Sequence, residues 1–492
     1  MMSGKEKLVK EKSIGKNAVL NMIRQGLSVL FPLITYPYAM RVLGPESLGK
    51  VSYTQSIISY FALLAMLGVS NYIIREGARI RDDKEKFNIF VSEVYTINVI
   101  FTFISYSLLV VITLSVPKLE NYRSLIFLQS ISIFLTTFGI DWINTIYEDF
   151  LKITVRSICT YILTIVLLFV FVKDSGDYYA YALLTVITNG IICISNRITF
   201  GKYVKLHLTK DIKYKKHISS LVILFVNAIA ITINTSFDTT MLGWIKGDYA
   251  VGVYSLSVKV YSVIKNIICA VYIVSLPRLS YYCGIKNFQE YKSLNTKIWS
   301  YIVLLVVPTA IGMVFTSKFI VYFMGGAELS EAVLSLRILS ISLIFSSLSG
   351  IIMNSMNISL RRETENLIVT AASAMINVVL NFIFIPLLSY NGAAITTLIS
   401  ETLLLILCTT RFKEIKTYVD FKQIVLVGIR SVIGVIFMTI SWLVITKLTL
   451  SPLLEFIVTI ISSVAIYGIM MIVMQEPLII NPLIGIVRKI KN

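Results

Sequence analysis

Four apolar stretches of the sequence carry polar and charged side chains at helical spacing, so that each set falls on one face of a helix. Inside a membrane-sized apolar stretch such side chains are costly, and they usually face a cavity or a binding site. The residues that we assign to a substrate-binding cavity are Asn21, Arg24, Gln55, Asn234, Lys259 and Lys265. Three of them are cations, which would give the cavity a positive potential suited to an anionic ligand. The alternative is ordinary polar contact between helices, with the cations reaching toward lipid headgroups.

Carboxylates also occur within apolar stretches, at Glu93 and at the three positions that we consider for ion coupling, Asp141, Asp238 and Glu401. A carboxylate in such a place can bind a coupling cation, H⁺ or Na⁺, or it can neutralise a nearby cation in an ion pair. Asp238 and Lys259 fall in the outward halves of adjacent predicted helices, which would allow an ion pair between them. Both interpretations stay open for the three acids.

These residues need membrane-spanning elements to position them. Of the 492 residues, 56% are hydrophobic, and they gather in blocks long enough to cross a hydrocarbon core of about 30 Å. Backbone hydrogen bonds must close within each block there, so the blocks are helices. We predict fourteen spans, at 17–41, 47–68, 88–114, 124–145, 151–172, 178–199, 218–243, 250–276, 298–324, 332–356, 366–388, 392–410, 423–446 and 453–475.

The charges between the predicted spans indicate orientation. The formal net charge is +18, and one side of the predicted topology carries about four times as many Lys and Arg as the other. Because cytoplasmic loops are enriched in these residues, we expect both termini in the cytoplasm. The same distribution explains the basic charge without a nucleic-acid partner.

A faint internal repeat divides the predicted helices into two lobes. Leu-Gly, a polar turn and then Gly-x-x-Ser occur at 43–52 and again at 242–255, and transporters often contain such repeats with the substrate site at their interface. We therefore expect an all-α integral membrane protein, with two six-helix lobes around a central cavity and two additional C-terminal helices. The expected regions are a basic cytoplasmic tail (1–16), an N-lobe (17–200), a basic cytoplasmic linker (201–217), a C-lobe (218–411), two further spans (412–475) and a cytoplasmic C-terminal tail (476–492).

The same topology argues against enzyme chemistry. The predicted loops are all short, which leaves no room for a soluble catalytic or nucleotide-binding domain. The five cysteines have no paired metal-ligand spacing, and the two histidines share one basic loop. We therefore expect no metal, no cofactor and no catalytic residues. A membrane polymerase or glycosyltransferase is a weaker alternative, because the outer loops lack a paired acidic motif.

An ordered set of short motifs resembles a known family. The motifs are Pro37-Tyr38, the run 41–49, Tyr60-Phe61, Leu67-Gly68, the run 75–79, Asp141-Trp142 with Glu148, Asp238 with the run 241–243, the run 252–255 with Lys259, Asn377, Asn381, Ile385-Pro386, the run 392–394 and Glu401. In this set, which covers most of the chain, the sequence resembles the polysaccharide repeat-unit flippases (Wzx type) of the MOP exporter superfamily. Gly77 departs from the bulkier residue that is usual in that family.

The resemblance implies a MATE-like fold and a flippase in the bacterial inner membrane, which carries undecaprenyl-diphosphate-linked oligosaccharides for O-antigen, capsule or exopolysaccharide synthesis. It implies alternating access around a cavity lined by helices 1, 2, 7 and 8, with polysaccharide polymerase and chain-length proteins as further partners. Three other functions stay open: a flippase for lipid-linked peptidoglycan or teichoic acid precursors, a multidrug/cation antiporter of the same superfamily, and the membrane enzyme named above.

Overall fold

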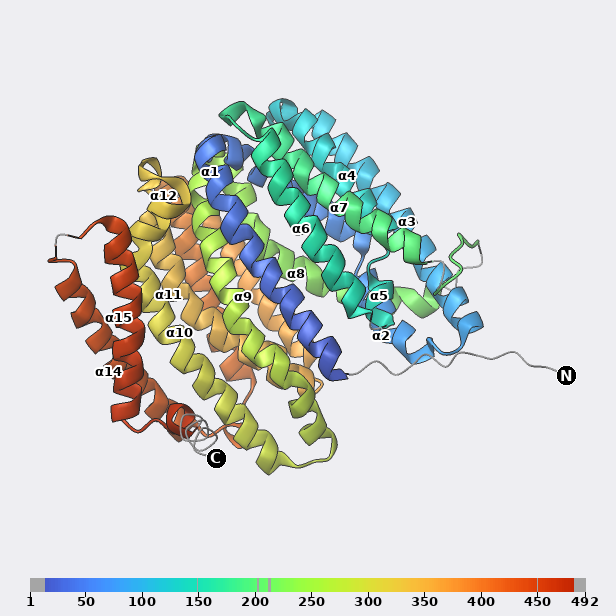
Figure 1. The fold of residues 1–492 in the computed structure, drawn as a ribbon. Helices are drawn as coiled ribbons and strands as arrows, with labels where there is room; N and C mark the ends of the chain where they lie inside the picture. The colour runs from blue at the N-terminus through green and yellow to red at the C-terminus, as the bar shows by residue number, and fades with distance from the viewer. Residues whose placement is uncertain (1–13, 148, 201–202, 211–213, 449, 482–492) are drawn as a thin grey trace. The chain divides into compact units, whose positions relative to one another are not determined.

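The computed structural model describes residues 14–147, 149–200, 203–210, 214–448 and 450–481, and the regular structure in these ranges is helical (Figure 1). The helices are α1 Ile14–Met66, α2 Val69–Ile80, α3 Lys84–Ser115, α4 Arg123–Gly139, α5 Trp142–Ile146, α6 Phe150–Phe171, α7 Tyr178–Phe200, α8 Tyr214–Lys246, α9 Asp248–Gly284, α10 Phe288–Gly325, α11 Ala332–Ile351, α12 Glu363–Arg411, α13 Ile415–Tyr418, α14 Phe421–Ile445 and α15 Pro452–Val473. A π-helical turn, η4 Ile352–Asn357, continues α11.

Twelve helical stretches in the described part of the chain are long and apolar enough to cross a membrane, which confirms the all-helical membrane fold. Two of the helices themselves, α1 and α12, contain an internal break. Within α1, Gly44 has φ 75° and ψ 171°, and within α12, Ser389 has φ 53° and ψ −133°. Each break falls between two of the predicted spans. Two pairs of predicted spans, 17–41 with 47–68 and 366–388 with 392–410, are thus each counted as one stretch, which explains why there are twelve stretches and fourteen predicted spans.

Contacts between Cα atoms divide the chain into two compact units. Unit 1 contains Met1–Leu43 and Tyr53–Thr232, and unit 2 contains Gly44–Ser52 and Ile233–Asn492. The division differs from the predicted lobes in two places. It falls within α8 rather than before it, and the short segment of α1 after Gly44 groups with unit 2.

Unit 1 has a core of buried side chains from α2, α3 and α5, including Ile73, Phe87, Val91 and Ile143. The segment that follows α7 runs along α3 and bonds to polar side chains spaced one helical turn apart. The backbone N–H of Lys205 donates to Asn88 (3.1 Å), that of His207 to Ser92 (3.4 Å) and that of Thr209 to Thr96 (3.1 Å). Side chains of α3 therefore accept hydrogen bonds from three backbone N–H groups of this segment.

Unit 2 is built around α11, which packs against α9, α10 and α12, while α14 pairs with α15 and with α10.

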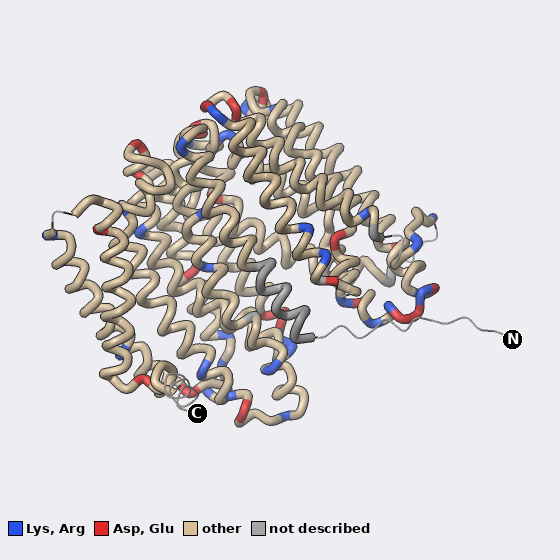
Figure 2. The backbone as a smooth tube through the Cα atoms, in the orientation of Figure 1, with Lys and Arg blue, Asp and Glu red and all other residues tan. Residues whose placement is uncertain are grey.

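Figure 2 shows Lys, Arg, Asp and Glu mainly near the ends of the helices, with few along their middles. Large apolar side chains such as Ile198 (75% exposed) and Leu387 (73%) face outward. This distribution is typical of helices surrounded by lipid.

Two glycines in unit 2 bring separate backbone segments into direct contact. A Cβ on Gly49 would lie 1.8 Å from the carbonyl oxygen of Asp248, and a Cβ on Gly252 would lie 1.9 Å from that of Pro45. Each glycine therefore faces the main chain of the other segment. Gly247, with φ 86° and ψ −175°, has nearly the backbone conformation of Gly44. The repeat thus pairs Gly44 with Gly247 rather than with Gly243, which lies inside α8.

Candidate functional site

A buried carboxylate in unit 2 is surrounded by uncharged polar groups from two other helices. Asp238 of α8 is 4% exposed. Its Oδ1 accepts a hydrogen bond from Asn381 Nδ2 (2.6 Å), and its Oδ2 lies 2.7 Å from Thr397 Oγ1 and 3.0 Å from the Tyr254 hydroxyl. Tyr254 comes from α9, and the other two residues come from α12. We call these four residues the Asp238 cluster.

The cluster continues into a second shell of oxygen atoms. Asn381 Nδ2 also donates to Asn377 Oδ1 (3.0 Å), one turn earlier in α12. Thr397 Oγ1 lies 2.9 Å from the carbonyl of Ala393. Because a threonine hydroxyl has one proton, Thr397 donates either to that carbonyl or to Asp238. In the first case the Thr397 oxygen and the neighbouring Asp238 Oδ2 each keep a lone pair that could bind a cation.

Farther along the contact between α9 and α12, which we call the α9–α12 seam, Lys265 of α9 pairs with Glu401 of α12. Lys265 Nζ lies 2.9 Å from Glu401 Oε1 and 3.3 Å from the Tyr261 hydroxyl. Tyr261 Oη in turn donates to Ser346 Oγ of α11 (3.0 Å). Helical spacing produces this seam, because residues 254, 261 and 265 share one face of α9 and residues 397 and 401 share one face of α12.

The remaining predicted cavity residues lie on different helices. Lys259 is half-buried in α9, and the carboxylate of Asp238 bonds to its cluster rather than to this lysine. The ion pair considered for these two residues is therefore not formed. Asn234 of α8 lies in unit 2 and donates to the Thr370 carbonyl (3.4 Å). Gln55 lies in unit 1 and is exposed.

Arg24 and Asn21 lie in the first turns of α1, and their side chains are outside the described part of the structure. Asp141 lies in unit 1, just before α5, and its side chain is 60% exposed. Its Oδ1 accepts hydrogen bonds from Arg156 Nη2 (2.9 Å) and from Asn196 Nδ2 (3.1 Å). Asp141 and Glu401 are thus both in ion pairs, whereas the Asp238 carboxylate has neutral partners.

Three members of the Asp238 cluster were not predicted as site residues. Asn381 was noticed only within the resemblance, although its spacing from Asn377 puts two amides on one face of α12. Thr397 stands four residues before Glu401, which is the corresponding signal on the next part of α12. Tyr254 also lies within the resemblance, in the run 252–255, but it gives no spacing signal, since an aromatic residue near a helix start is ordinary in a membrane protein.

Two family descriptions match the sequence. Residues 14–282, more than half of the chain, match the family described as "Polysaccharide biosynthesis protein". Residues 223–383 match the family described as "MatE".

Curated relatives cover most of the chain. The "Putative O-antigen transporter" of Escherichia coli (strain K12) is 22% identical over 394 residues, which is 80% of this chain and 94% of that protein. "Capsular polysaccharide biosynthesis protein CapF" of Staphylococcus aureus is 23% identical over 398 residues, 80% of this chain and 97% of that protein.

Solved structures share the fold at low sequence identity. The inward closed conformation of the lipid II flippase MurJ has a TM-score of 0.73 at 16% identity and covers 94% of this chain and 99% of that one. An inward-facing multidrug resistance MATE family transporter of the MOP superfamily has a TM-score of 0.58 at 16% identity, covering 81% and 99%. The MATE-like fold expected from the sequence is therefore confirmed.

Proposed function

The chain belongs to the polysaccharide biosynthesis protein family, Wzx-type transporters of the MOP superfamily, and from this we propose that it is a flippase for undecaprenyl-diphosphate-linked oligosaccharide repeat units. The families that it matches are transporters and not enzymes, as predicted. The cargo is supported by two curated relatives, whose descriptions name O-antigen and capsular polysaccharide. The location in the bacterial cytoplasmic membrane, with fourteen crossings and both termini inside, belongs to the same proposal.

The proposed cargo carries a diphosphate, which needs positive charge where the dielectric constant is low. Arg24, Lys259 and Lys265 are the cations that we assign to it, within the central cavity that the sequence predicts. Arg can hold a phosphate with two parallel hydrogen bonds, while Lys acts as a point charge. Lys265 pairs with Glu401, and we assign the direct contacts with the head group to Arg24 and Lys259. Alternating access would carry the head group across.

The observation that carries the coupling mechanism is the Asp238 cluster. A carboxylate that is 4% exposed within a membrane-length helix, with only neutral hydrogen-bond partners, is costly to leave charged. It must bind a proton or a cation, and carbonyl, amide and hydroxyl oxygens suit a hard cation. We therefore assign the coupling cation, H⁺ or Na⁺, to Asp238.

The test is flipping of a defined undecaprenyl-diphosphate oligosaccharide in proteoliposomes under an imposed Na⁺ or H⁺ gradient. The Asp238→Asn substitution keeps the size of the side chain and removes its charge, so we expect gradient-driven flipping to be lost. Glu328→Gln, which changes an exposed carboxylate of unit 2, is the matched control and should flip like the wild type. Gradient-dependent flipping by the Asp238→Asn variant at the wild-type rate would rule out the coupling role.

The same assay tests the cargo and its cations. Lys259→Ala should slow flipping, and normal flipping by that variant would contradict the binding role of Lys259. Lipid-linked peptidoglycan precursor serves as a competing cargo. A preference for it would move the assignment to cell-wall synthesis.

The MatE match over residues 223–383 favours one further candidate, a multidrug/cation antiporter. Such a protein would exchange cations on addition of a cationic drug and would not need a sugar-lipid. Drug-stimulated exchange without sugar-lipid flipping would replace the flippase assignment.

A further inference from the structure

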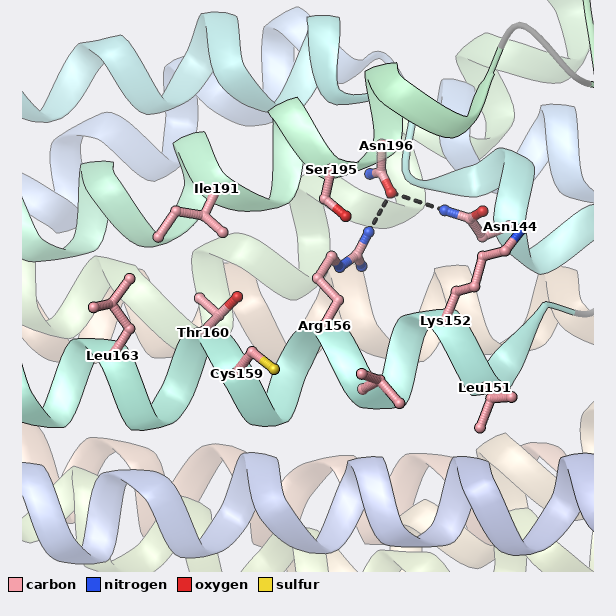
Figure 3. Close-up of a pocket in the computed structure, with 11 residues that line it drawn as sticks. Asn144, Leu151, Lys152, Arg156, Cys159, Thr160, Leu163, Ile191, Ser195 and Asn196 are labelled. Atoms are coloured by element: carbon pink, nitrogen blue, oxygen red, sulfur yellow. Dashed lines mark hydrogen bonds between the residues drawn. The ribbon is translucent and has the colours of Figure 1, made fainter.

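Unit 1 contains a pocket of about 560 Å³ that the proposed transport cycle does not use. Residues of α5, α6 and α7 line it, and Figure 3 shows Arg156 and Asn144 converging on Asn196 at one end. The lining consists of Asn144, Leu151, Lys152, Val155, Arg156, Cys159, Thr160, Leu163, Ile191, Ser195 and Asn196.

The polar end of this pocket is built around a largely buried arginine. The side chain of Arg156 is 10% exposed. Its Nη1 donates to Asn196 Oδ1 and its Nη2 to Asp141, while its Nε is buried without a hydrogen-bond partner. Asn144 Oδ1 and Thr160 Oγ1, also from the lining, are buried without a partner. A buried polar atom without a partner is uncommon and calls for a missing ligand or water.

A second cation lies one helical turn earlier, at the mouth of the pocket. Lys152 is 45% exposed, pairs with Asp149 and donates to the Tyr203 hydroxyl (2.9 Å). Its ammonium has three protons, so one remains for a ligand. Both cations thus have a carboxylate partner and also retain donors that those partners do not use.

Helix electrostatics favour an anion at this end. Lys152 and Arg156 occupy the first two turns of α6, where the helix dipole is positive and where the N-cap residue Asp149, which pairs with Lys152, is the acidic residue at the helix start. Cations at that position repel the dipole. An anion bound between them would offset this repulsion and would meet charge-assisted donors.

The other walls of the pocket are apolar and partly exposed. Leu151 (49% exposed), Val155 (51%) and Leu163 (43%) follow one side of α6, and Ile191 of α7 faces them. A small soluble anion would gain nothing from these walls. A ligand with a charged head and an apolar chain would use both parts of the pocket.

We propose that this pocket binds the phosphate of an anionic membrane lipid, with the head group on Arg156 and Lys152 and the start of the chain along Leu151, Val155 and Leu163. In the orientation that we predict from the Lys and Arg distribution, this end of α6 faces the cytoplasmic leaflet. Basic pockets between helices on that side are suited to anionic lipid headgroups. A bulk phospholipid and an undecaprenyl phosphate share this chemistry, and the test separates them.

Cys159 lines the pocket and is exposed, so it can report occupancy. In a full-length variant with the other four cysteines replaced by Ala, the rate of maleimide alkylation of Cys159 would be measured in nanodiscs. The nanodiscs would contain phosphatidylcholine alone, or with added phosphatidylglycerol, undecaprenyl phosphate or inorganic phosphate. We expect an anionic lipid to slow alkylation.

The cations set the expected size of the effect. Each of Lys152→Gln and Arg156→Gln should weaken the protection about fivefold, the affinity change typical of one basic residue near anionic lipid. Lys173→Gln, at the other end of α6, is the matched control and should keep the protection. Lys152 is partly exposed, so its variant should fold even where the Arg156 variant does not. Native mass spectrometry of the same variants would count the bound lipid.

Each outcome decides the proposal. Protection by phosphatidylglycerol identifies bulk phospholipid as the ligand, and protection by undecaprenyl phosphate alone identifies the polyprenyl carrier. Equal alkylation with phosphatidylcholine and with both anionic lipids overturns the proposal. Protection by inorganic phosphate without lipid overturns the lipid part, and protection that survives Lys152→Gln overturns the role of the cations. No flipping assay enters, so failure here leaves the proposed function unaffected.

Discussion

His217 is a fully buried side chain whose two ring nitrogens both have partners in unit 1. Its Nε2 lies 2.7 Å from Glu93 Oε2, and its Nδ1 lies 2.9 Å from the Tyr72 hydroxyl. Glu93 is itself only 4% exposed. The three side chains join the start of α8 to α2 and α3, and the imidazole satisfies both of the others.

We predict that His217→Ala lowers the free energy of unfolding by about 3–5 kcal/mol, because it leaves the Glu93 carboxylate buried without its partner. The matched control is His207→Ala. That histidine is exposed and lies 3.3 Å from Ser92 Oγ, so its loss should change the free energy by no more than about 0.5 kcal/mol. Thermal unfolding of both variants in detergent measures the difference, and equal effects would contradict the structural role of His217.

The sequence identifies the residues that belong to such clusters more readily than it shows which of them contact one another. Glu93 stands out as an acid within a span, and His217 as a histidine in a basic loop, but their contact depends on how the segment after α7 returns to α3. The same holds for Asp238, whose partner Thr397 is 159 residues away. Spacing fixes the face of a helix, whereas packing decides which faces meet.

At the scale of the element, α3 begins at a well-formed N-cap. The side chain of Asp83 accepts a hydrogen bond from the backbone N–H of Lys86 (3.1 Å), and its other oxygen pairs with the Lys86 ammonium (2.8 Å). The hydrogen bonds from Lys86 lower the pKa of the Asp83 carboxyl from its ordinary value. A carboxylate at this position also complements the positive end of the helix dipole.

The lowered pKa gives a stability effect with a defined sign. The stabilising contribution of Asp83 is complete above the ordinary carboxyl pKa of about 3.9, and it is lost as the pH falls through the lower value of the folded state. We predict that Asp83→Asn, which keeps the cap but not the charge, unfolds at a lower temperature than the wild type at pH 7, and that this difference shrinks below pH 4. Melting curves at both pH values measure it.

The neighbouring carboxylate supplies the control for this cap. Asp82→Asn alters an exposed side chain and should leave the melting temperature unchanged. A wild-type advantage over Asp83→Asn that persisted unchanged at low pH would refute the electrostatic part of the explanation.

Element positions were largely predictable, because an apolar block of membrane length is a strong signal. The breaks at Gly44 and Ser389 fall between predicted spans. We did not predict that the helix continues directly on both sides of each break, so that α1 and α12 each join two predicted spans. The repeat was found in the wrong register at its second copy, because Gly243 and Gly247 are both possible turn glycines and only the backbone conformation shows that Gly247 corresponds to Gly44.

For the whole molecule, the Lys and Arg distribution predicts the side of the membrane on which each loop lies. Cys283, near the end of α9, should be cytoplasmic. In intact cells that carry this single cysteine, an impermeant maleimide should therefore not label the protein until the membrane is permeabilised. Lys118→Cys, in a predicted outer loop, should be labelled at once, and the reverse pattern would invert the topology.

The mutual approach of Gly49 and Gly252 restricts how this region can change over evolution. A second-site mutation usually rescues an oversized side chain by trimming the atoms that obstruct it. Here the obstructing atoms are the main-chain carbonyls of Asp248 and Pro45, which every amino acid carries. A genetic screen that begins from Gly49→Ala should therefore yield reversions to glycine. Substitutions of Asp248, whose carbonyl the new methyl group would contact, should not restore function.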